Sequence, residues 1–386
     1  MNNSLLKPLK IGNYIIPIPV VQGGMGVGVS LSGLAGAVAA CGGIGIISTA
    51  QIGFRDKGFD ADPIGCNLRA IKEEIGKARA IAERQQYEVA RIKAMGGDNN
   101  KPAGMKEMGE NGNKPAGLIG VNIMVATKKY EEYVKAAVEA GADMIISGAG
   151  LPMMLPGLVE KAKTMIAPIV SSLKSVHVIT KYWLKKYDRL PDMVVIEGPL
   201  AGGHLGFQAE QLENIEAMHY DEEIHKIIEY VNECGEVHGK KIPVAVAGGI
   251  YSREDGEKYF AMGASGVQIA TRFVTTYECD ASDAYKEAYI RAKKEDIVIV
   301  KSPVGMPGRA VGNSFVKRTM KGRIPHKGCH SCIVSCRPDQ TPYCITEALI
   351  NAVEGNVEQG LVFCGANAYR AEKLEHVADI MKEFAP

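Results

Sequence analysis

Short apolar segments recur along most of the chain, and their spacing restricts the fold more than any other feature. Eight runs of about four to eight residues are each followed by a polar, glycine-rich or helix-prone stretch. Runs that are apolar without strict alternation are typical of strands buried on both faces of a parallel sheet. The runs are Ile18–Gln22, Ile44–Ser48, Leu118–Met124, Asp143–Ser147, Ala167–Ser171, Met193–Glu197, Pro243–Ala247 and Gly266–Ala270.

Helical patterns join several of these runs. Helices are predicted over Lys128–Ala140, Gly157–Met165 and Val176–Tyr187. Strand, helix and strand at a spacing of about 25 residues form a βαβ unit, and eight such units close a (β/α)8 TIM barrel. An open doubly wound sheet is the main alternative. It is less favoured because glycine-rich loops follow several strands here, whereas a doubly wound sheet concentrates them at one switch point.

The predicted barrel covers residues 1–276, and residues 277–386 are expected to form a helical C-terminal extension that contains a group of cysteines. Two insertions in the barrel are expected, at about 70–117 and 205–240. The first is a charged, helix-prone stretch followed by a surface loop in which the tetrapeptide KPAG occurs twice, thirteen residues apart. The second follows the sixth strand and is a candidate lid.

Charge and composition argue against several classes of partner. The 45 Lys and Arg residues nearly match the 44 Asp and Glu residues, so no overall field favours nucleic acid or an anionic membrane. The uncharged stretch between Lys10 and Arg55 contains eleven glycines and two prolines, which argues against a membrane-spanning helix. Because Met1–Lys10 has no apolar signal region, we expect a cytoplasmic protein with reduced thiols.

The functional site of a parallel barrel lies at the carboxyl ends of its strands. The first strand runs into Gly23, Gly24 and Met25, which would let a flat ring approach the main chain, although the same sequence suits an ordinary tight turn. The third strand carries Asn122 between apolar neighbours. A buried amide needs hydrogen-bond partners, so Asn122 is expected either to reach a ligand or to bridge neighbouring strands.

The sixth strand ends at Glu197 and is followed by Gly202, Gly203 and His204. The two glycines are expected to leave the histidine sterically open, and an imidazole pKa near 6.5 suits proton transfer at neutral pH. A loop histidine with a structural role is the alternative. The position at a strand end, close to a carboxylate, favours His204 as a general acid or base.

Glycines also follow the seventh and eighth strands, where parallel barrels usually bind phosphate. Gly249 and the turn Gln268–Thr271 offer backbone N–H groups and the start of a helix, whose dipole favours an anion. Arg272 would add positive charge if it points inward. A phosphate grip, a glycine-lined floor and one acid/base group suit a phosphorylated planar cofactor better than a metal. No GxGxxG motif of dinucleotide binding joins a strand to a helix.

These segments resemble the nitronate monooxygenase (2-nitropropane dioxygenase) family, which is related to the FMN-dependent enoyl-ACP reductases. The motifs QGGMG, GGIGIIS, GVNIM, EGPLAGGH, VAGGI, GASGVQIATRF and SPVGMPGRAVGNSF occur in the family's order over most of residues 11–315. The resemblance implies that His204 is the catalytic residue. It also implies that FMN contacts Gly23, Gly24, Met25, Asn122, Glu197, Gly202, Gly249, Gln268, Ile269, Ala270 and Thr271.

Two positions depart from the family pattern. Nitronate enzymes often have Gln where this chain has Glu197, whereas the enoyl reductases often have Glu. The phosphate turn usually has Gly where this chain has Ala270, and alanine still offers its N–H group if its φ is negative. The first departure leaves both activities open.

The resemblance implies an FMN-dependent oxidoreductase, most simply a nitronate monooxygenase that converts alkyl nitronates and O2 to carbonyl compounds and nitrite. An NAD(P)H-dependent reductase of enoyl thioesters on the same fold is the alternative. A flavin and iron–sulfur electron-transfer protein and a phosphate-binding barrel without catalysis are further alternatives. The expected partners are a small-molecule substrate, NAD(P)H in the reductase case, and a second copy of the chain.

The extension contains four closely spaced cysteines, with the pattern Cys329-x2-Cys332-x3-Cys336-x7-Cys344. Four thiolates at short spacing can bind zinc or an iron–sulfur cluster. The pattern resembles the cluster segment of the dienoyl-CoA reductases, in which the last spacing is longer. Four reduced structural thiols are the alternative. Simple nitronate monooxygenases lack such a run, so the segment sets this chain apart from them.

Overall fold

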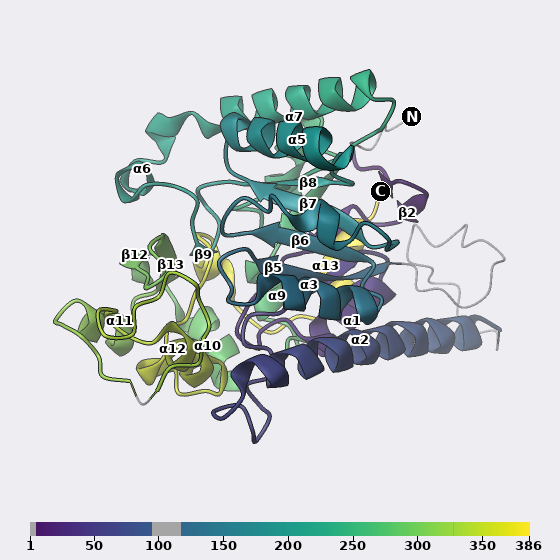
Figure 1. Ribbon diagram of the computed structural model, residues 1–386. Coiled ribbons are helices and arrows are strands. Elements are labelled where there is room, and N and C mark those ends of the chain that lie inside the picture. Colours follow the sequence, from purple (N-terminus) through teal and green to yellow (C-terminus); the bar gives the residue numbers. More distant parts are fainter. Residues whose placement is uncertain (1–4, 95–116, 327) are drawn as a thin grey trace.

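The computed structural model describes residues 5–94, 117–326 and 328–386 (Figure 1). Eight parallel strands form a closed barrel in the order β10-β11-β3-β4-β5-β6-β7-β8, which confirms the predicted barrel and excludes the open sheet. The eight predicted strands match the observed ones to within about two residues at each end. The strands are β3 (Val20–Gln22), β4 (Ile44–Ser48), β5 (Leu118–Met124), β6 (Met144–Gly148), β7 (Met165–Val170), β8 (Val194–Glu197), β10 (Val244–Ala247) and β11 (Gly266–Ile269).

Apolar side chains of the strands are divided between two layers, because successive residues of a strand point to opposite faces. Ile46 and Val195 fill the barrel interior, whereas their chain neighbours Ile47 and Val194 face the surrounding helices. A hairpin of β1 (Leu9–Ile11) and β2 (Tyr14–Ile16) contributes three side chains to the interior layer. This hairpin lies at the start of the strands and therefore leaves their carboxyl ends open for a site.

Helices connect the strands on the outside of the barrel. Helix α2 begins at Pro63, a residue favoured in the first turn of a helix, and runs past the barrel along one side (Figure 1). Most of the KPAG-containing loop lies outside the described residues. The connecting helices are α1 (Ser32–Ala40), α2 (Pro63–Ala94), α3 (Tyr130–Glu139), α4 (Leu155–Leu158), α5 (Leu173–Tyr187), α6 (Ala209–Glu213), α7 (Tyr220–Val237), α8 (Arg253–Ala261) and α9 (Thr271–Val274), with a 3-10 turn η1 (Glu216–Met218).

The predicted helix over Gly157–Met165 is wrong. Helix α4 already ends at Leu158, and Met165 is the first residue of β7. The Met165 N–H donates to the Asp143 carbonyl at 2.9 Å. This hydrogen bond joins the chain to the neighbouring strand, although its local composition favours a helix. Half of the stretch 205–240 is helix α7, whose buried isoleucines pack on the barrel as in an ordinary βα unit.

The extension includes a small sheet in addition to helices. Strands β12 (Ile297–Lys301) and β13 (Pro307–Val311) form an antiparallel hairpin that pairs with β9 (Gly203–His204). The sequence did not predict this hairpin. The helices are α10 (Asp283–Arg291), α11 (Ser314–Thr319), α12 (Ile345–Val353) and α13 (Val377–Glu383), with 3-10 turns η2 (Lys294–Asp296), η3 (Val357–Gln359) and η4 (Ala368–Arg370).

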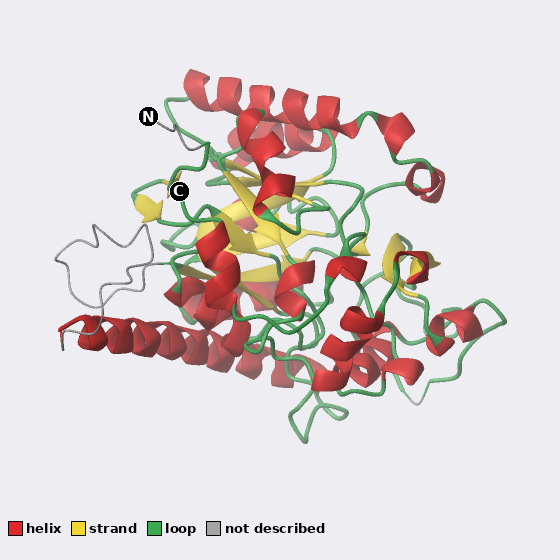
Figure 2. Cartoon of the chain, turned by 180° about the vertical axis from the view of Figure 1, so that it is seen from behind, coloured by secondary structure: helices red, strands yellow, loops and turns green. Residues whose placement is uncertain are grey.

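The extension gathers at one end of the barrel, where the hairpin and its helices lie together (Figure 2). Its last helix, α13, leaves this group and contacts α1, so that Ile380 and Met381 belong to the same buried cluster as Leu34 and Val38. The predicted boundary at residue 276 falls between α9 and α10. Helix α13 belongs to the extension by sequence, although it packs on the barrel helix α1. Within the described ranges, no helix has the length and apolar character needed to cross a membrane.

Candidate active site

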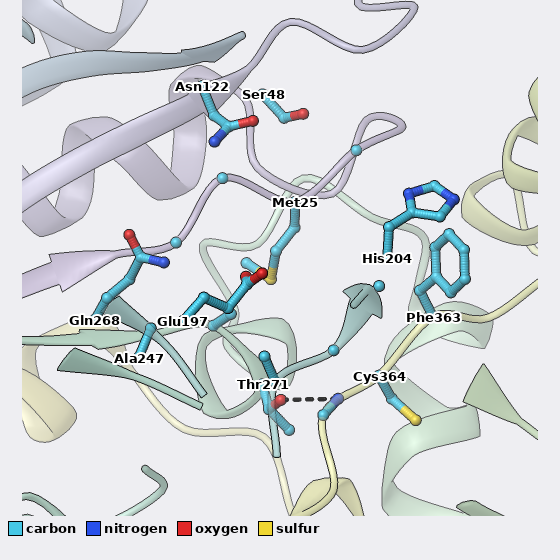
Figure 3. Close-up of a pocket in the computed structure, with 18 of the residues that line it drawn as sticks. Met25, Ser48, Asn122, Glu197, His204, Ala247, Gln268, Thr271, Phe363 and Cys364 are labelled. Atoms are coloured by element: carbon cyan, nitrogen blue, oxygen red, sulfur yellow. Dashed lines mark hydrogen bonds between the residues drawn. The ribbon is translucent and has the colours of Figure 1, made fainter. Parts of the chain in front are cut away.

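The carboxyl ends of the strands and the extension enclose a cavity at the barrel mouth (Figure 3). Its empty space, which includes open solvent at the entrance, is about 1330 Å³. Of the residues predicted to form the site, Ile269 does not line the cavity, because its side chain is buried in the core. The predicted residues that line it are Gly23, Gly24, Met25, Asn122, Glu197, Gly202, His204, Gly249, Gln268, Ala270 and Thr271.

The loop after β3 forms the floor of the cavity and lies tightly against β5. A Cβ atom at Gly24 would overlap the Cβ of Asn122, so only glycine fits there without movement. Buried Gln22 holds this loop in place, since its amide donates to the Gly23 carbonyl while its Oε1 accepts from the Ile46 N–H at 3.0 Å. The sequence did not predict this role of Gln22, although a buried amide at a strand end was a visible signal.

Asn122 lies at the carboxyl end of β5 and its side chain faces the cavity (Figure 3). Among the described residues its side-chain amide has no hydrogen-bond partner, whereas its main-chain carbonyl accepts from both the N–H and the Oγ1 of Thr49. The expectation that the amide bridges neighbouring strands is therefore wrong. The amide remains available for a ligand.

Glu197 ends β8 and points into the same cavity (Figure 3). Burial raises the pKa of its carboxyl to about 7, because the ionised form loses its hydration. The carboxyl group has no hydrogen-bond partner in the described part of the chain, and the same holds for the side-chain amide of Gln268 on β11. Three polar side chains thus face the cavity without hydrogen-bond partners among the described residues.

His204 lies on β9 and is held by two residues of the extension. Its Nε2 lies 2.7 Å from the Ser302 Oγ, and the edge of its ring packs on Phe363 with centroids 4.9 Å apart. Burial lowers the pKa of the imidazole to about 4, so the ring is neutral at pH 7. The expectation of a sterically open histidine is wrong, because the flanking strand β13 and these two side chains fix its position.

The loops after β10 and β11 form the opposite end of the cavity. Gly249 has a φ of 82°, which favours glycine, and its carbonyl accepts from the Asn367 amide at 2.6 Å. Ala270 has a φ of −123°. Because this φ is negative, the alanine can still offer its backbone N–H group in the turn, where the family usually has glycine. Thr271 begins α9, and its Oγ1 accepts from the Gly365 N–H at 3.1 Å (Figure 3).

Arg272 does not point into the cavity. Its guanidinium pairs with Glu375 at 2.8 Å and with Glu383 at 2.7 Å, and both carboxylates belong to the C-terminal part of the chain. The conditional prediction that Arg272 supplies charge to a phosphate is therefore wrong. The ion pairs instead fasten the region of α13 to the start of α9.

The extension supplies one wall of the cavity, which the sequence did not predict. Tyr285 and Tyr289 on α10 both donate to the carbonyl of Phe363, and Leu349 on α12 lies beside them. A Cβ at Gly202 would overlap the main chain of Cys364, so the wall lies directly against the loop after β8. The two tyrosines are four residues apart and therefore lie on the same face of a helix. This spacing is the local sequence feature that could have indicated that both line the cavity.

Cys329, Cys332, Cys336 and Cys344 do not line the cavity, whereas Cys364 of the extension does. The first four lie beside the loops that follow β4 and β5, since the Cys332 carbonyl accepts from the Lys128 N–H at 3.0 Å. Potential metal-binding atoms of His330, Cys344 and Glu347 lie within 4.8 Å of one another.

Comparison with known proteins identifies the family. A family model described as nitronate monooxygenase matches residues 7–386. The chain belongs to the nitronate monooxygenase family. It is 26% identical over 196 residues to a probable nitronate monooxygenase of Staphylococcus saprophyticus, and this match covers 50% of the chain and 51% of that protein. The chain thus spans about half the length of this curated relative.

Solved structures share the fold across nearly the whole chain. FabK from Thermotoga maritima superposes with a TM-score of 0.64 at 22% identity, covering 96% of this chain and 92% of that one. A nitroalkane oxidase from Streptomyces ansochromogenes gives a TM-score of 0.65 at 17% identity, covering 96% and 95%. At these identities the likeness supports the fold alone.

Proposed function

We propose that the protein is an FMN-dependent oxidoreductase of the nitronate monooxygenase type, which oxidises alkyl nitronates with O2 to carbonyl compounds and nitrite. The observation that carries this proposal is the arrangement of the cavity. Asn122, Glu197 and Gln268 face it without protein partners among the described residues, above a floor that accepts only glycine at Gly24. Unpartnered polar groups in a concave site are typical of a site that is completed by a ligand.

The residues present fit FMN. The floor formed by Gly24 and Met25 suits a flat ring, and the amides of Asn122 and Gln268 suit the polar edge of that ring. The backbone N–H groups around Gly249 and Thr271 suit a phosphate. Bound FMN would supply the electron acceptor of the reaction and pass the electrons on to oxygen.

The side chains of the cavity would handle the proton and the charge. Neutral His204 can accept a proton from a neutral nitroalkane, and its contact with Ser302 orients the ring. Glu197, with a pKa of about 7, is largely uncharged in slightly acidic solution and then does not repel an anionic nitronate. The wall of Tyr285, Tyr289 and Phe363 would limit the access of water to the reacting atoms.

An enoyl-thioester reductase that uses NAD(P)H is the second candidate. It is favoured by Glu197, since the flavin enoyl reductases often have Glu at this position. The third candidate, a flavin and iron–sulfur electron-transfer protein, depends on whether the cysteine segment carries iron. All three share the same cofactor pocket and differ in what delivers electrons to it.

Flavin reduction in an anaerobic stopped-flow instrument distinguishes these candidates. The FMN-loaded protein would be mixed separately with an alkyl nitronate and with NAD(P)H. Rapid bleaching by the nitronate supports the monooxygenase, whereas bleaching by NAD(P)H alone supports the reductase. If neither reagent reduces the flavin, the monooxygenase and the reductase are both contradicted. Colourless protein that cannot be reconstituted with FMN contradicts all three.

We also propose that the protein acts in the cytoplasm and forms a homodimer. The small formal net charge of +1 favours association between copies over attraction to a charged surface. Cell fractionation tests the location, and light scattering coupled to size-exclusion chromatography tests the dimer. Recovery in the membrane fraction, or a mass of one chain at micromolar concentration, contradicts the respective proposal.

A further inference from the structure

The cysteine segment, residues 329–344, meets the first turn of α12, and three different kinds of metal-binding side chain come together there. The potential metal-binding atoms of His330, Cys344 and Glu347 all lie within 4.8 Å of one another. The His330 Nε2 lies 3.9 Å from the Glu347 Oε1. In the part of the chain that the structure describes, no other three His, Cys, Asp or Glu side chains gather so closely. Of the four cysteines in the segment, this group includes Cys344 alone.

The three donors are an imidazole nitrogen, a thiolate sulfur and a carboxylate oxygen. Zinc accepts all three types, whereas magnesium and calcium prefer oxygen alone and an iron–sulfur cluster is held by thiolates. With bonds of about 2.0–2.3 Å, the ligand atoms of a tetrahedral zinc ion lie about 3.3–3.6 Å apart. The group therefore needs to contract only slightly from its present spacing to close around a zinc ion.

The ring of His330 is oriented as in a metal-binding histidine. Its Nε2 faces Glu347, while its Nδ1 lies 3.9 Å from the Asp60 Oδ1 on the other side. Histidine ligands commonly have a carboxylate beside the ring nitrogen that does not bind the metal. The ring also stacks on Phe59 with centroids 5.4 Å apart, and the side chain is only 12% exposed. Packing thus holds Nε2 toward the group.

The other two donors are placed by the start of one helix. Cys344 is the N-cap residue of α12, and Glu347 lies in the first turn of that helix, three residues later. Side chains at this spacing lie on the same side of a helix. The helix therefore sets the separation of the thiol and the carboxylate.

One buried side chain joins the two halves of the group. The amide of Gln51, in the loop after β4, donates to the His330 carbonyl at 3.3 Å and to the Thr346 Oγ1 at 3.2 Å. Thr346 stands between the two donors of α12, and the Gln51 Oε1 in turn accepts from the buried Asn67 amide at 2.6 Å. A polar network behind the donors is typical of a preorganised metal site.

We propose that His330, Cys344 and Glu347 bind a zinc ion, with a water molecule in the fourth position. Three protein ligands and one water form a common four-coordinate zinc site. None of the three side chains lines the cavity, so the zinc site is separate from the proposed flavin pocket and does not rest on the proposed function. Bound zinc joins the cysteine segment to α12, and Leu349 of that helix lines the cavity.

Zinc titration of the purified protein, after treatment with a chelator, tests the site. We expect uptake of about one zinc per chain. Cobalt(II) in place of zinc should give the absorption bands of a four-coordinate ion with a thiolate ligand, at longer wavelengths than oxidised flavin absorbs. Protein that takes up no zinc overturns the proposal. Iron with labile sulfide in protein purified without oxygen indicates a cluster and also overturns it.

Single variants identify the ligands. His330→Ala and Glu347→Gln should each weaken zinc binding by at least about tenfold, because each removes one of three protein ligands. Cys329→Ser is the matched control, since it changes an exposed thiol next to His330 and should bind zinc as the unmodified protein does. Loss of zinc in Cys329→Ser, with normal binding in His330→Ala, would assign the metal to the cysteines of the segment and overturn the proposal.

A measurement on the unmodified protein covers the case in which the variants fail to fold. Alkylation with iodoacetamide, followed by mass spectrometry, reports which thiols a metal protects. Cys344 should be protected when zinc is present and alkylated after a chelator has removed it, whereas exposed Cys329 should react equally in both states. Equal alkylation of Cys344 with and without zinc would contradict its role as a ligand.

Discussion

The barrel mouth and the cysteine segment lie at the same end of the molecule but are assembled in opposite ways. The mouth collects residues from strand ends as far apart in sequence as Gly24 and Gln268. The cysteine segment gathers its thiols from residues 329–344 alone. In the mouth the strands fix the positions of polar groups that do not repel one another. In the segment, the cysteines lie in turns and loops and, at Cys344, directly before helix α12.

This difference predicts that the mouth keeps its shape without a ligand, whereas the segment does not. A cavity built on barrel strands is preorganised by the packing of the core. A group of thiols on loops is ordered mainly by the metal they bind. The predictions below test whether the two regions differ in this way.

The largest effect is expected from removing the acid/base group of the mouth. His204→Ala should lower turnover about 100-fold or more while FMN stays bound, because His204 is not part of the phosphate end of the cavity. Steady-state kinetics and the flavin content of the purified protein measure the two effects. His225→Ala, which changes an exposed histidine of α7, is the matched control. If the His204 variant keeps normal turnover, His204 has a structural and not a catalytic role.

A methyl group in the floor should weaken the cofactor site. In Gly24→Ala the new Cβ overlaps Asn122, so FMN affinity should fall by about tenfold or more, corresponding to about 1–3 kcal/mol of overpacking. Fluorescence titration of the apoprotein with FMN gives the dissociation constants. Gly76→Ala in α2 meets no atom within 4 Å and should bind FMN normally. Equal affinity of the two variants would contradict a preorganised floor.

If the cysteine segment binds a metal centre, as its spacing suggests, removing that metal should affect the segment and leave the mouth intact. Release of a bound metal by a mercurial should lower the thermal midpoint by a few degrees, since about 1 kcal/mol shifts the midpoint by roughly 2 °C or less in a chain of 386 residues. The FMN dissociation constant should change less than about threefold, because the strands that carry the floor are unaffected. Thermal unfolding followed by circular dichroism and the FMN titration provide both numbers. A complete loss of FMN binding would show that the two regions are not independent.

The pH dependence of nitronate oxidation should reflect Glu197. The pKa of this carboxyl is raised to about 7, so raising the pH through this value adds a negative charge to the cavity. The kcat/KM for an anionic nitronate should therefore fall by about tenfold above pH 7. His204, with its pKa lowered to about 4, should add no step near pH 6.5. Glu197→Gln should flatten the profile, and a fall that persists in this variant would assign the step to another group.

The same two groups give stability opposite pH dependences. Because the folded pKa of Glu197 is raised, its contribution to stability is present below about 4.5 and is lost as the pH rises to about 7. For His204 the folded pKa is lowered, so its contribution is present above about 6.5 and is lost as the pH falls toward about 4. Denaturant unfolding of Glu197→Gln should lack the first dependence.

The smallest effect on the site is expected at Arg272. Arg272→Ala removes two ion pairs and should cost about 1–3 kcal/mol of stability, because Glu375 loses its ion-pair partner and Glu383 keeps only the hydrogen bond from the Arg253 N–H. FMN affinity should change less than about twofold, since this side chain does not face the cavity. Urea unfolding and FMN titration measure the two quantities. A large loss of affinity would place Arg272 in the phosphate site after all.

The sequence predicted the barrel and most of the mouth for one physical reason. Uninterrupted apolar runs such as Leu118–Met124 can be buried only between two layers, and the carboxyl ends of parallel strands must meet at one edge. The same reasoning did not predict the helix boundary at Leu158, where hydrogen bonding to the neighbouring strand overrides local helix propensity.

The wall of the cavity could not be predicted in this way. Tyr289 and Phe363 reach the mouth through the folding of the extension, in which the sequence shows no regular succession of strands and helices like that of the barrel. Ser302 stands at the start of a motif that the sequence analysis recognised, but its contact with His204 depends on the pairing of β13 with β9. The raised pKa of Glu197 and the lowered pKa of His204 follow from burial, which emerges only when this wall is in place.

The position of helix α13 has a consequence for the order of assembly during synthesis. This helix packs beside α1, although everything from α10 to η4 lies between α9 and α13 in the chain. While the ribosome is still translating the extension, the apolar surface around Leu34 and Val38 has no cover from Ile380 and Met381. The barrel wall is thus completed only after Val377–Glu383 has emerged, and until then the nascent chain carries an exposed apolar strip that chaperones would recognise.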